Sequence, residues 1–576
     1  MRKTQPVSLA PAARLAGNKA YQRQPQRRPI SLRLDANEGA GPDPSLLDAV
    51  RADFVHVART YPDASHLEQV LARREGVPSE CVLATAGADD ALDRLCRAML
   101  EPGRRALMTR PTFEMLPRFV RSAGGEVDEI PWMEGPFPGR AMADAVTPAT
   151  SLIFVVSPNN PTGGVAALED LRLLRQAAPR ALLVLDHAYV EFADRDLTRE
   201  ALQLPGVAVT RTLSKAWGFA GMRVGYLVAP PDVVQWARRS GLPYALSGLS
   251  IALAERYLTR GDQPVLRRAR QVRHEVQELT ALLASMGARP LPSQANFVLA
   301  RFPDAPLVAD LLASLGISVR TFPDQVDLRD CLRIGCLGDT ESHRRLTFAL
   351  RTAMRPQALL FDLDGVLADV SQSYRRAIIE TAATYGVSVT REQIAAVKAE
   401  GNANNDWVLT HSLLARAGVR APLDQVTARF EQLYQGAPDT PGLRLSERLL
   451  VDRAQLERWA ERYPLAIVTG RPRRDAERFL AQHGVLDCFR TLVCMHDAAL
   501  KPSPAPVRLA LERLGVEHAW MIGDTVDDVT ASRAAGVIPI GVVAPGDNVE
   551  HATDTLIQAG AARVLQAASH LSEILP

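Results

Sequence analysis

The segment ALLFDLDG, at residues 358–365, begins a new strand-and-loop pattern well past the middle of this 576-residue chain. Its apolar run ends directly in acidic residues, as a buried strand does when it carries polar groups to the edge of a sheet. A chain of this length exceeds what one hydrophobic core can organise, so at least two domains are expected. The short join RPQ, at 355–357, precedes the segment, and the sequence therefore predicts a domain boundary there.

The composition, with 47% hydrophobic and 23% charged residues, is typical of a soluble globular protein. The formal net charge of +2 gives no strong attraction to nucleic acid or to a membrane, and we expect neither as a partner. No apolar stretch approaches the ~20 residues of a membrane span. The six cysteines form no CxxC pair and show no His-Cys metal spacing, so we expect reduced thiols and a cytoplasmic location.

Apolar runs and amphipathic segments alternate through the first part of the chain. The runs at 151–158, 181–192 and 207–213 are typical of buried strands in a parallel sheet, and the segment at 167–178 has a helical pattern. This alternation predicts an α/β fold. Helical patterns dominate from about 250 to 350, with one strand-like run at 296–302, which predicts a smaller α+β lobe.

The segment TRTLSKAWGFAGMRVGY, at 210–226, carries most of the chemistry of the first half. A predicted strand ends just before Ser214 and Lys215, and Arg223 follows after a short loop. Most lysines are solvated surface charges, but the neighbours of Lys215 are small and apolar, which suits a lysine held out of bulk water. Desolvation lowers the pKa of a lysine and makes it a nucleophile that can form a Schiff base with an aldehyde.

Motifs around this lysine indicate a family. In chain order they are LDANEG, YPDAS, TAGADDAL, RPTFEML, SPNNPTGG, LDHAYVEF, RTLSKAWGFAGMRVGY, NFVLARF and CLRIGCLG. Residues from about 1 to 352 therefore resemble fold-type I pyridoxal-phosphate aminotransferases of class I/II, most closely histidinol-phosphate aminotransferases. The resemblance implies pyridoxal 5'-phosphate as cofactor, small amino donors and acceptors as substrates, and a homodimer formed through this half. We expect an N-terminal arm (1–40), a cofactor-binding large domain (41–250) and a small domain (251–355).

The resemblance also implies roles for residues around the cofactor ring. Lys215 would form the Schiff base and later move a proton between substrate and cofactor. Asp186 would pair with the pyridinium nitrogen and keep it protonated, so that the ring can accept electrons. Asn160 and Tyr189 would hydrogen-bond to the ring's 3-oxygen, and Phe113 would stack on the ring face.

The cofactor phosphate requires several hydrogen-bond donors. Ala88 and Asp89 open a predicted helix, so their amides can point at an anion. By the resemblance, Ser214 and Arg223 would add a hydroxyl and a guanidinium. Tyr61 would reach the same phosphate from the partner subunit.

Substrate recognition is expected from Arg333, the family's usual anchor for an acidic group, and from Arg320. Two arginines suit a phosphate, whereas one suffices for a carboxylate. Tyr21 and Asn37 are further candidates from the N-terminal arm, and a structural role stays open for them and for Arg320.

The sequence departs from the family pattern at a few positions. His187 stands where Glu is usual, Phe113 replaces a common Tyr, and the run LDANEGAGPDP is looser than usual. No catalytic group is lost, so transamination is still expected. The substrate stays open, because related enzymes that act on aromatic amino acids or decarboxylate threonine phosphate share most of this framework.

A second ordered set of motifs begins at residue 358. LLFDLDGVLADV, LAIVTGRP, KPSPAP and AWMIGDTVDD together resemble haloacid dehalogenase-like phosphatases of subfamily IA, over residues 356–576. This implies a Rossmann-like domain, and the helical stretch at about 371–445 is expected to form an inserted cap. Asp362 would attack phosphorus and Asp364 would protonate the leaving oxygen and then activate water. An acid at both positions favours phosphoryl transfer over dehalogenation.

The remaining motif residues would bind a metal ion and the phosphoryl group. Hard oxygen ligands for Mg²⁺ would come from Asp362, the carbonyl of Asp364, Asp524 and Asp528. Thr469 and Lys501 would bind the phosphoryl oxygens and offset the charge of the transferring group. We expect a small phosphate ester as the substrate.

Histidine biosynthesis offers a reason to join the two enzymes, because transamination gives histidinol phosphate and the next step removes its phosphate. The sequence-based hypothesis is a bifunctional enzyme for these steps. Other hypotheses stay open: a different aromatic or phosphorylated amine in a secondary pathway, a C-terminal half that only regulates, or a phosphatase that consumes pyridoxal phosphate itself.

Overall fold

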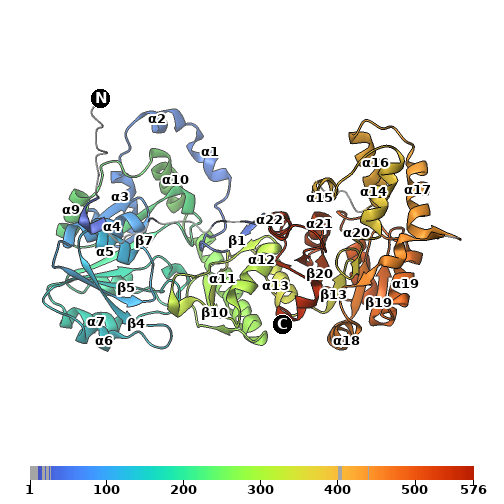
Figure 1. Cartoon of the computed structure of the whole chain (residues 1–576). Coiled ribbons are helices and arrows are strands. Elements are labelled where there is room, and N and C mark those ends of the chain that lie inside the picture. Colours follow the sequence, from blue (N-terminus) through green and yellow to red (C-terminus); the bar gives the residue numbers. More distant parts are fainter. Residues whose placement is uncertain (1–10, 16–19, 21–24, 26, 400–404, 439) are drawn as a thin grey trace, which may run out of the picture. The chain divides into compact units, whose positions relative to one another are not determined.

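The computed structural model describes the chain apart from residues 1–10, 16–19, 21–24, 26, 400–404 and 439 (Figure 1). The described residues group into two compact units. The first contains 34–303 and 320–343 with the described residues before 24, and the second contains 24–33, 304–319 and 344–576. The domain limits expected from the sequence remain predictions.

Within the described part of the first unit, the largest sheet has seven strands in the order β2-β8-β7-β6-β5-β3-β4. Strand β8 runs antiparallel to both of its neighbours, β2 and β7, and the other neighbouring pairs of this sheet are parallel. The strands are β2 (Val82–Thr85), β3 (Arg105–Arg110), β4 (Glu126–Pro131), β5 (Thr150–Val156), β6 (Leu182–Asp186), β7 (Val207–Thr212) and β8 (Gly225–Val228). Every residue of β5, β6 and β7 is buried, so the predicted buried strands are confirmed.

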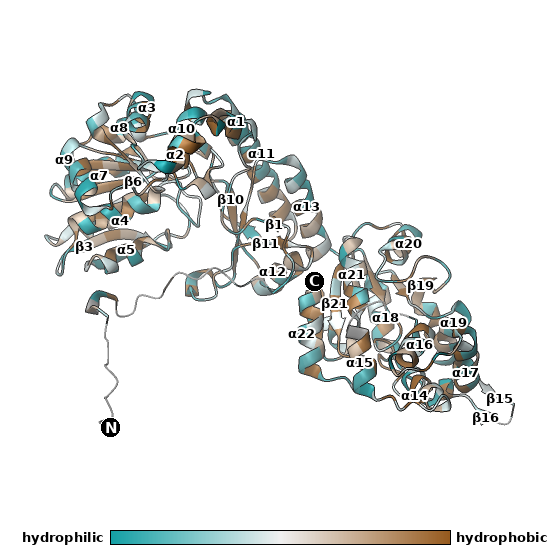
Figure 2. Cartoon of the chain, turned by 90° about the horizontal axis from the view of Figure 1, so that it is seen from above, coloured by the Kyte–Doolittle hydropathy of each residue, from teal (hydrophilic) through white to brown (hydrophobic). Residues whose placement is uncertain are grey.

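Alternate side chains of these strands enter two hydrophobic cores, one on each face of the sheet. Leu152, Phe154 and Val156 of β5 pack with helices α4 (Ala88–Met99), α5 (Leu116–Ser122) and α9 (Pro231–Ser240). Ile153 and Val155 pack with α6 (Gly139–Asp144), α7 (Leu168–Ala177) and α8 (Thr198–Leu202). Helices such as α7 and α9 carry hydrophilic residues beside hydrophobic ones, as expected for helices that cover a sheet with one side (Figure 2).

A smaller antiparallel sheet completes the first unit, in the order β12-β10-β9. Its strands are β9 (Arg289–Pro290), β10 (Phe297–Arg301) and β12 (Cys331–Gly335), and α11 (Gln263–Ser285) packs against it. The strand predicted at 296–302 is therefore confirmed. The other helices of this unit are α1 (Ser45–Arg51), α2 (Phe54–Arg59), α3 (Ser65–Glu75) and α10 (Gly248–Thr259). No helix in the described ranges is long and apolar enough to cross a membrane.

The second unit is built on a parallel sheet in the order β19-β18-β13-β20-β21-β22. The strands are β13 (Ala358–Phe361), β18 (Leu465–Val468), β19 (Phe489–Val493), β20 (Ala519–Gly523), β21 (Ile538–Val542) and β22 (Arg563–Leu565). Around it lie α18 (Arg453–Arg462), α19 (Arg473–Gln482), α20 (Ala505–Leu514), α21 (Val526–Ala534) and α22 (Val549–Ala559). The pattern that restarts at residue 358 thus supplies the central strand β13.

A helical insertion interrupts this unit between β13 and β18. It contains α14 (Tyr374–Thr384), α15 (Arg391–Ala399), α16 (Asp406–Arg416) and α17 (Leu423–Gln435). The chain enters it through β14 (Ala368–Asp369) and leaves through β17 (Arg448–Leu449), and these two short strands pair with each other. We call this insertion the cap and the β14–β17 pair its hinge.

Residues that precede β13 also pack within the second unit. The carbonyl of Thr352, in α13 (Thr340–Met354), accepts a hydrogen bond from the indole of Trp520 at 2.8 Å, and its hydroxyl lies 2.9 Å from Nδ1 of His518. Arg533 donates to the carbonyl of Ser314, at the end of α12 (Ala305–Ser314), at 2.7 Å. Nearby, β1 (Leu32–Arg33) pairs with β11 (Ile317–Ser318). The second unit therefore includes segments from before residue 356.

Replacing Phe361 by Ala should lower the unfolding free energy of the second unit by about 3–5 kcal/mol, because a buried phenyl leaves a cavity. Phe361 is fully buried in β13 and stacks on Trp459 with ring centroids 5.6 Å apart. Hydrogen exchange read by mass spectrometry should show lost protection in β18 and β20 and wild-type protection in β5 and β6. Phe54→Ala, at a position 52% exposed, is the matched control. Wild-type protection of β18 in the Phe361 variant would contradict the prediction.

Candidate functional site

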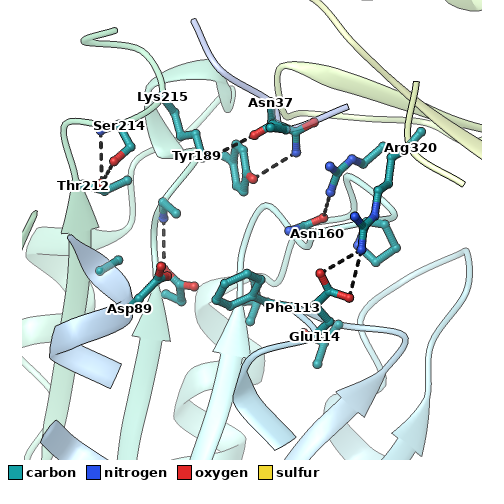
Figure 3. A pocket seen from close by; sticks show the side chains of 18 of the residues that line it. Asn37, Asp89, Phe113, Glu114, Asn160, Tyr189, Thr212, Ser214, Lys215 and Arg320 are labelled. Carbon is teal, nitrogen blue, oxygen red and sulfur yellow. Dashed lines mark hydrogen bonds and ion pairs between the residues drawn. The ribbon is translucent and has the colours of Figure 1, made fainter. Parts of the chain in front are cut away.

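A pocket with a cavity volume of about 200 Å³ opens at the carboxyl ends of the parallel strands in the first unit. The sequence-predicted residues that line it come from loops after several strands and from the start of α4 (Figure 3). They are Asn37, Ala88, Asp89, Phe113, Asn160, Asp186, Tyr189, Ser214, Lys215, Arg223, Arg320 and Arg333.

Among the described residues, one further predicted residue, Tyr61, does not line this pocket. Tyr61 is 82% exposed, and its ring stacks on that of Tyr244 with centroids 4.7 Å apart. The sequence predicts that Tyr61 acts on the partner subunit rather than on its own. Tyr21 lies outside the described residues.

Lys215 reaches into the pocket beside Tyr189 (Figure 3). Its Nζ donates to the carbonyl of Ala36 at 3.1 Å and lies 5.5 Å from the centre of the Tyr189 ring. The loop that carries Ala36 approaches the lysine loop so closely that a Cβ on Gly39 would lie 2.4 Å from the Lys215 carbonyl oxygen. Glycine in the LDANEG motif is therefore required by a backbone contact.

Asp186 ends β6 and lies deep in the pocket, only 3% exposed. Its Oδ1 accepts hydrogen bonds from the hydroxyl of Thr210 at 3.0 Å and from the amide of Ala188 at 3.2 Å. Burial raises the pKa of Asp186 to about 6, because the surrounding protein solvates a carboxylate poorly. A protonated ring nitrogen of the expected cofactor, if it lay beside Asp186, would favour the charged form of this carboxylate.

Donors for an anion gather at the start of α4. Gly87 has a φ of 87°, and a Cβ there would lie 2.5 Å from Nη2 of Arg223, so glycine lets the guanidinium approach the helix end. Arg223 reaches the hydroxyl of Ser214 at 3.4 Å and the carboxylate of Asp89 at 3.3 Å. Thr212, which the sequence reasoning missed, donates to Ser214 at 2.9 Å. The guanidinium and hydroxyl thus lie beside the backbone amides at the N-terminus of α4, where an anion can bind.

Arg320 and Arg333 lie side by side because their backbones form a reciprocal pair of hydrogen bonds, each 3.0 Å long. Arg333 is 7% exposed, contacts the amide oxygen of Asn160, and donates to the carbonyl of Asp35 at 2.7 Å. Burial lowers the pKa of Arg333 from its usual value. Two guanidinium groups on one wall of the pocket favour an anionic ligand.

Glu114 is a further pocket residue that the sequence reasoning missed. Its carboxylate accepts two hydrogen bonds from Nη2 of Arg320, at 2.9 and 3.1 Å (Figure 3). It directly follows Phe113 in the RPTFEML motif, and nothing in the local sequence identifies its partner, which is more than 200 positions away. Any anion that binds Arg320 must compete with Glu114.

Asn37 and His187 have contrasting environments. The Asn37 amide nitrogen donates to the Tyr189 hydroxyl at 3.0 Å, and its buried Oδ1 has no hydrogen-bond partner among the described residues. His187 is 2% exposed, and its Nδ1 lies 3.0 Å from the hydroxyl of Thr198. Burial lowers the pKa of His187 to about 3, so the ring is neutral. His187, which stands where Glu is usual in the family, therefore adds no charge to the site.

The second predicted site lies at the carboxyl ends of β13, β18 and β20 in the second unit. Carboxylate oxygens of Asp362, Asp524 and Asp528 lie within 4.8 Å of one another. Lys501 is 4% exposed, and its Nζ donates to Asp362 and to the carbonyl of Val468, both at 2.9 Å, and also to Asp528. The structure thus brings together these four predicted residues.

Burial dominates the electrostatics of this cluster. It raises the pKa of Asp362 to about 7, against the opposing effect of the Lys501 ammonium. Burial by itself would lower the pKa of Lys501, but the facing carboxylates of Asp362 and Asp528 raise it. The lysine is therefore cationic, and the carboxylates have further capacity to bind a cation.

The DLDG motif needs its glycine for space. Gly365 has a φ of 76°, and a Cβ there would lie 2.3 Å from a carboxylate oxygen of Asp524. Asp364, two residues after Asp362, faces a small pocket lined by Tyr374 and Trp407 of the cap. A wider cavity borders Asp524, and its lining includes Arg375, Arg391 and His551.

The remaining predicted residue of the second site, Thr469, directly follows β18 and is buried. Its hydroxyl accepts a hydrogen bond from the amide of Arg471 at 3.2 Å. The side chain of Arg471 contacts Asp364 and Glu447. The sequence reasoning quoted Arg471 within LAIVTGRP but gave it no role, and it missed Glu447 altogether.

Sequence spacing also missed a cluster outside both sites. Glu275, Cys336 and His343 place possible metal-ligand atoms within 4.8 Å of one another, although no His-Cys metal spacing is visible in the sequence. Glu275 already accepts hydrogen bonds from the amide of Gly338 at 2.9 Å and from Gln271 at 3.2 Å. Part of its acceptor capacity is therefore used within the protein.

Comparison with protein families assigns both parts of the chain. The family described as aminotransferase class I and II matches residues 47–350. The chain belongs to this family. The family described as haloacid dehalogenase-like hydrolase matches residues 356–536, so the C-terminal part carries a hydrolase domain of that type. The expected fold class and enzyme class are confirmed.

Three relatives and one solved structure define the similarity further. Histidinol-phosphate aminotransferase of Xanthomonas euvesicatoria pv. vesicatoria is 36% identical over 55% of this chain and 89% of its own length. Aromatic amino acid aminotransferase of Thermobifida fusca is also 36% identical, over 51% of this chain and 83% of its own. A Phytophthora nicotianae protein named imidazoleglycerol-phosphate dehydratase is 52% identical over 33% of this chain, which covers 44% of that protein.

The solved structure is histidinol-phosphate aminotransferase from Sinorhizobium meliloti in complex with pyridoxal-5'-phosphate. It is 28% identical, with a TM-score of 0.52, over 62% of this chain and 98% of its own. The likeness thus extends over nearly the whole of that enzyme.

Replacing Asp186 by Asn should stabilise the cofactor-free first unit at pH 8, by about 3 kcal/mol relative to wild type. The folded-state pKa of about 6 lies above the ordinary value of 3.8, so the ionised carboxylate destabilises the folded state. This cost is fully present above pH 6 and shrinks as the pH falls from about 6 to about 4, whereas Asn does not titrate. Hydrogen exchange of β6 and β7 at pH 8 and pH 5 measures the difference, and Asp194→Asn on the exposed surface is the control. A difference that does not depend on pH would contradict the assignment.

Proposed function

We propose that the chain is a bifunctional enzyme that transaminates between histidinol phosphate and 2-oxoglutarate and then hydrolyses a small phosphate ester, histidinol phosphate itself. The observation that carries the proposal is the pair of guanidinium groups, Arg320 and Arg333, in the pocket that holds Lys215. A phosphate ester with an amine is the kind of substrate that both parts of the chain would share. The relatives named for histidinol phosphate support this choice.

Pyridoxal 5'-phosphate fits the residues of the first pocket. The start of α4, Ser214 and Arg223 would hold its phosphate, and Asp186 would hold its ring nitrogen. Asn37 has a buried amide oxygen near Tyr189 that no described residue hydrogen-bonds, consistent with a polar ligand beside the ring. When bound, the cofactor supplies an aldehyde and an electron-accepting ring.

The side chains of this pocket would then divide the work of transamination. Lys215 would hold and move a proton at its Nζ, next to the substrate carbon. Asn160 and Tyr189 would orient the ring, Phe113 would cover one face, and Arg333 with Arg320 would bind the acidic end of the substrate. Tyr61, highly exposed on this chain, would complete the phosphate site of a second copy in a homodimer.

The second site fits Mg²⁺, because Asp362, Asp524 and Asp528 offer closely spaced carboxylate oxygens. When bound, the ion neutralises charge on the phosphoryl oxygens. Asp362 would form a bond from its carboxylate oxygen to phosphorus while the bond from phosphorus to the ester oxygen breaks. Lys501 and Thr469 would hold the phosphoryl oxygens, and Asp364 would give the leaving oxygen a proton.

A second candidate substrate for the first site is an aromatic amino acid. The relative named aromatic amino acid aminotransferase has the same 36% identity as the one named for histidinol phosphate. For the second site, a purely regulatory role and hydrolysis of pyridoxal phosphate are the alternatives. Measurements on separate substrates distinguish all of these.

Supplying imidazole-acetol phosphate, glutamate and Mg²⁺ should yield 2-oxoglutarate first and free phosphate afterwards. Lys215→Ala should reduce 2-oxoglutarate formation at least about 100-fold, since proton transfer alone contributes that much, and should still release phosphate from added histidinol phosphate. Asp362→Asn should show the opposite pattern.

The controls are Arg140→Ala and Asp424→Asn, at exposed positions outside both proposed sites. Transamination without hydrolysis of histidinol phosphate would disprove the second step, and pyridoxal phosphate as the preferred ester would favour the regulatory alternative. Transamination of phenylalanine alone would favour the aromatic substrate.

Arg320→Gln should raise the KM for histidinol phosphate by about tenfold or more, because it removes charged hydrogen bonds to the phosphate. The KM for phenylalanine should change less, since that substrate has a single acidic group. Steady-state transamination kinetics with both amino donors tests this prediction. Arg110→Gln is the control, because Arg110 is an exposed arginine that pairs with Asp327. Equal changes for the two donors would assign Arg320 a structural role through Glu114.

A further inference from the structure

Arg471 is a charged residue in the interior of the second unit that binds the proposed acid, Asp364. Its side chain is 1% exposed, and its Nε donates to Oδ1 of Asp364 at 2.6 Å. Nη2 of the same guanidinium also contacts Oδ1 of Asp364. Both contacts fall on one oxygen of the carboxyl group, so Oδ2 is the oxygen that can carry a proton.

A second buried carboxylate holds the other side of this guanidinium. Glu447 is only 3% exposed in its side chain, and its oxygens accept from Nη1 of Arg471 at 3.0 Å and from Nη2 at 3.3 Å. The hydroxyls of Tyr434 and Ser373 donate to Glu447 at 3.1 and 2.8 Å. Because both oxygens of Glu447 are used in this way, the carboxylate is fixed and in turn fixes the arginine.

Aromatic rings from two helices enclose Arg471. Its guanidinium carbon lies 4.8 Å from the centre of the Tyr374 ring, at the start of α14, and 5.4 Å from that of Phe479, in α19. Burial by itself would lower the pKa of Arg471, but the carboxylates of Asp364 and Glu447 help to raise it well above its usual value. The side chain is therefore a permanent cation with little freedom to rotate.

The partners of Arg471 come from the parts of the fold that a moving cap would shift. Glu447 directly precedes β17 of the hinge, while Tyr374 and Tyr434 belong to cap helices α14 and α17. Asp364 lies between β13 and β14, on the other chain segment that enters the cap. One guanidinium thus joins the catalytic loop to the hinge and to the cap.

We propose that Arg471 is a positioning residue that fixes Asp364 as the acid for the leaving group, with Glu447 holding Arg471 in place. This rests on the proposed phosphatase function. When the bond from phosphorus to the ester oxygen breaks, its electron pair stays on that oxygen, which takes the proton from Oδ2 of Asp364. Asp364 becomes a carboxylate whose Oδ1 remains bound to Arg471, and it can then accept a proton from the attacking water.

A buried salt bridge with only a structural role gives little net stability, because desolvation of both ions offsets their attraction. Here the rigid fork of the guanidinium selects one oxygen of Asp364 and leaves the other for proton transfer. Lysine keeps the charge but lacks the fork geometry. Comparing arginine with lysine at this position therefore separates geometry from charge.

The test compares two esters that differ in their need for an acid. p-Nitrophenolate leaves without a proton at neutral pH, whereas the alkoxide of O-phosphoethanolamine needs one. With Mg²⁺ and the full chain, Arg471→Lys should lower kcat/KM for O-phosphoethanolamine at least about 100-fold, the usual contribution of a general acid, and kcat/KM for p-nitrophenyl phosphate less than about tenfold. The ratio kcat/KM is compared because it reports the steps up to departure of the leaving group, before water attacks. Asp364→Asn should show the same preference for p-nitrophenyl phosphate.

Energetic coupling between Arg471 and Asp364 gives a second readout. Adding Arg471→Lys to Asp364→Asn should cause no further loss on O-phosphoethanolamine, because the arginine acts through the carboxyl group. Arg473→Lys, at an exposed arginine two positions away that pairs with Glu477, is the matched control and should leave both rates unchanged. Hydrogen exchange of β18 and α14 checks that each variant is folded.

The outcomes are distinguishable. Equal losses in kcat/KM on the two esters, or additive losses in the double variant, would overturn the positioning role while leaving the phosphatase function intact. If the wild-type chain hydrolyses neither ester nor histidinol phosphate, the phosphatase function and the role of Arg471 both fail. If Arg471→Lys unfolds the unit, the paired variant Arg471→Met with Glu447→Gln removes both buried charges, and it must show the same leaving-group preference.

Discussion

Parallel strands impose the constraint on which both sites depend, because they bring their carboxyl ends to the same edge of a sheet. In the first unit, Asp186 ends β6 and Lys215 lies just after β7. In the second, Asp362 follows β13, Thr469 follows β18, and Asp524 follows β20. Residues far apart in sequence thereby meet where the backbone of each strand stops and its loop begins. Both sites require this arrangement of strands, because without it their side chains would not lie close to one another.

Buried charge is the second feature common to both units. Asp186 is solvated mainly by a hydroxyl and an amide, whereas Asp362 faces a lysine. In both cases burial raises the pKa of the carboxyl group, so a cation brought by a ligand would bind strongly. The ionised carboxylates of Asp186 and Asp362 are thus destabilised by burial in the ligand-free protein, and a bound cation would offset this cost. Stability and activity are therefore in opposition at these positions.

The sequence was most informative where a residue's role depends on its neighbours along the chain. Motifs at strand ends placed Lys215, Asp186 and the aspartates of the second site in clusters that the structure contains. Residues whose role depends on a distant partner could not be predicted. Glu114 and Arg320 are separated by 206 positions, and Arg471 and Asp364 by 107.

Buried partners of this kind carry no local signature. A glutamate after an aromatic residue, or an arginine after a Thr-Gly pair, has the same sequence pattern whether it is solvated or buried. Tyr21 lies outside the described residues, so its expected role remains a prediction. The domain limits expected near residues 250 and 355 also remain predictions, since packing groups α12 and most of α13 with the second unit.

The packing of α12 and α13 with the second unit determines where the gene could be divided to produce the C-terminal part alone. A fragment that starts at residue 356, where the hydrolase family match begins, would lack Thr352 and Ser314. The indole of Trp520 in β20, His518 just before that strand, and Arg533 in α21 would each lose a hydrogen-bond partner. The start of the hydrolase family match and the start of the compact unit therefore differ, and a C-terminal fragment that folds independently would have to retain α12 and most of α13.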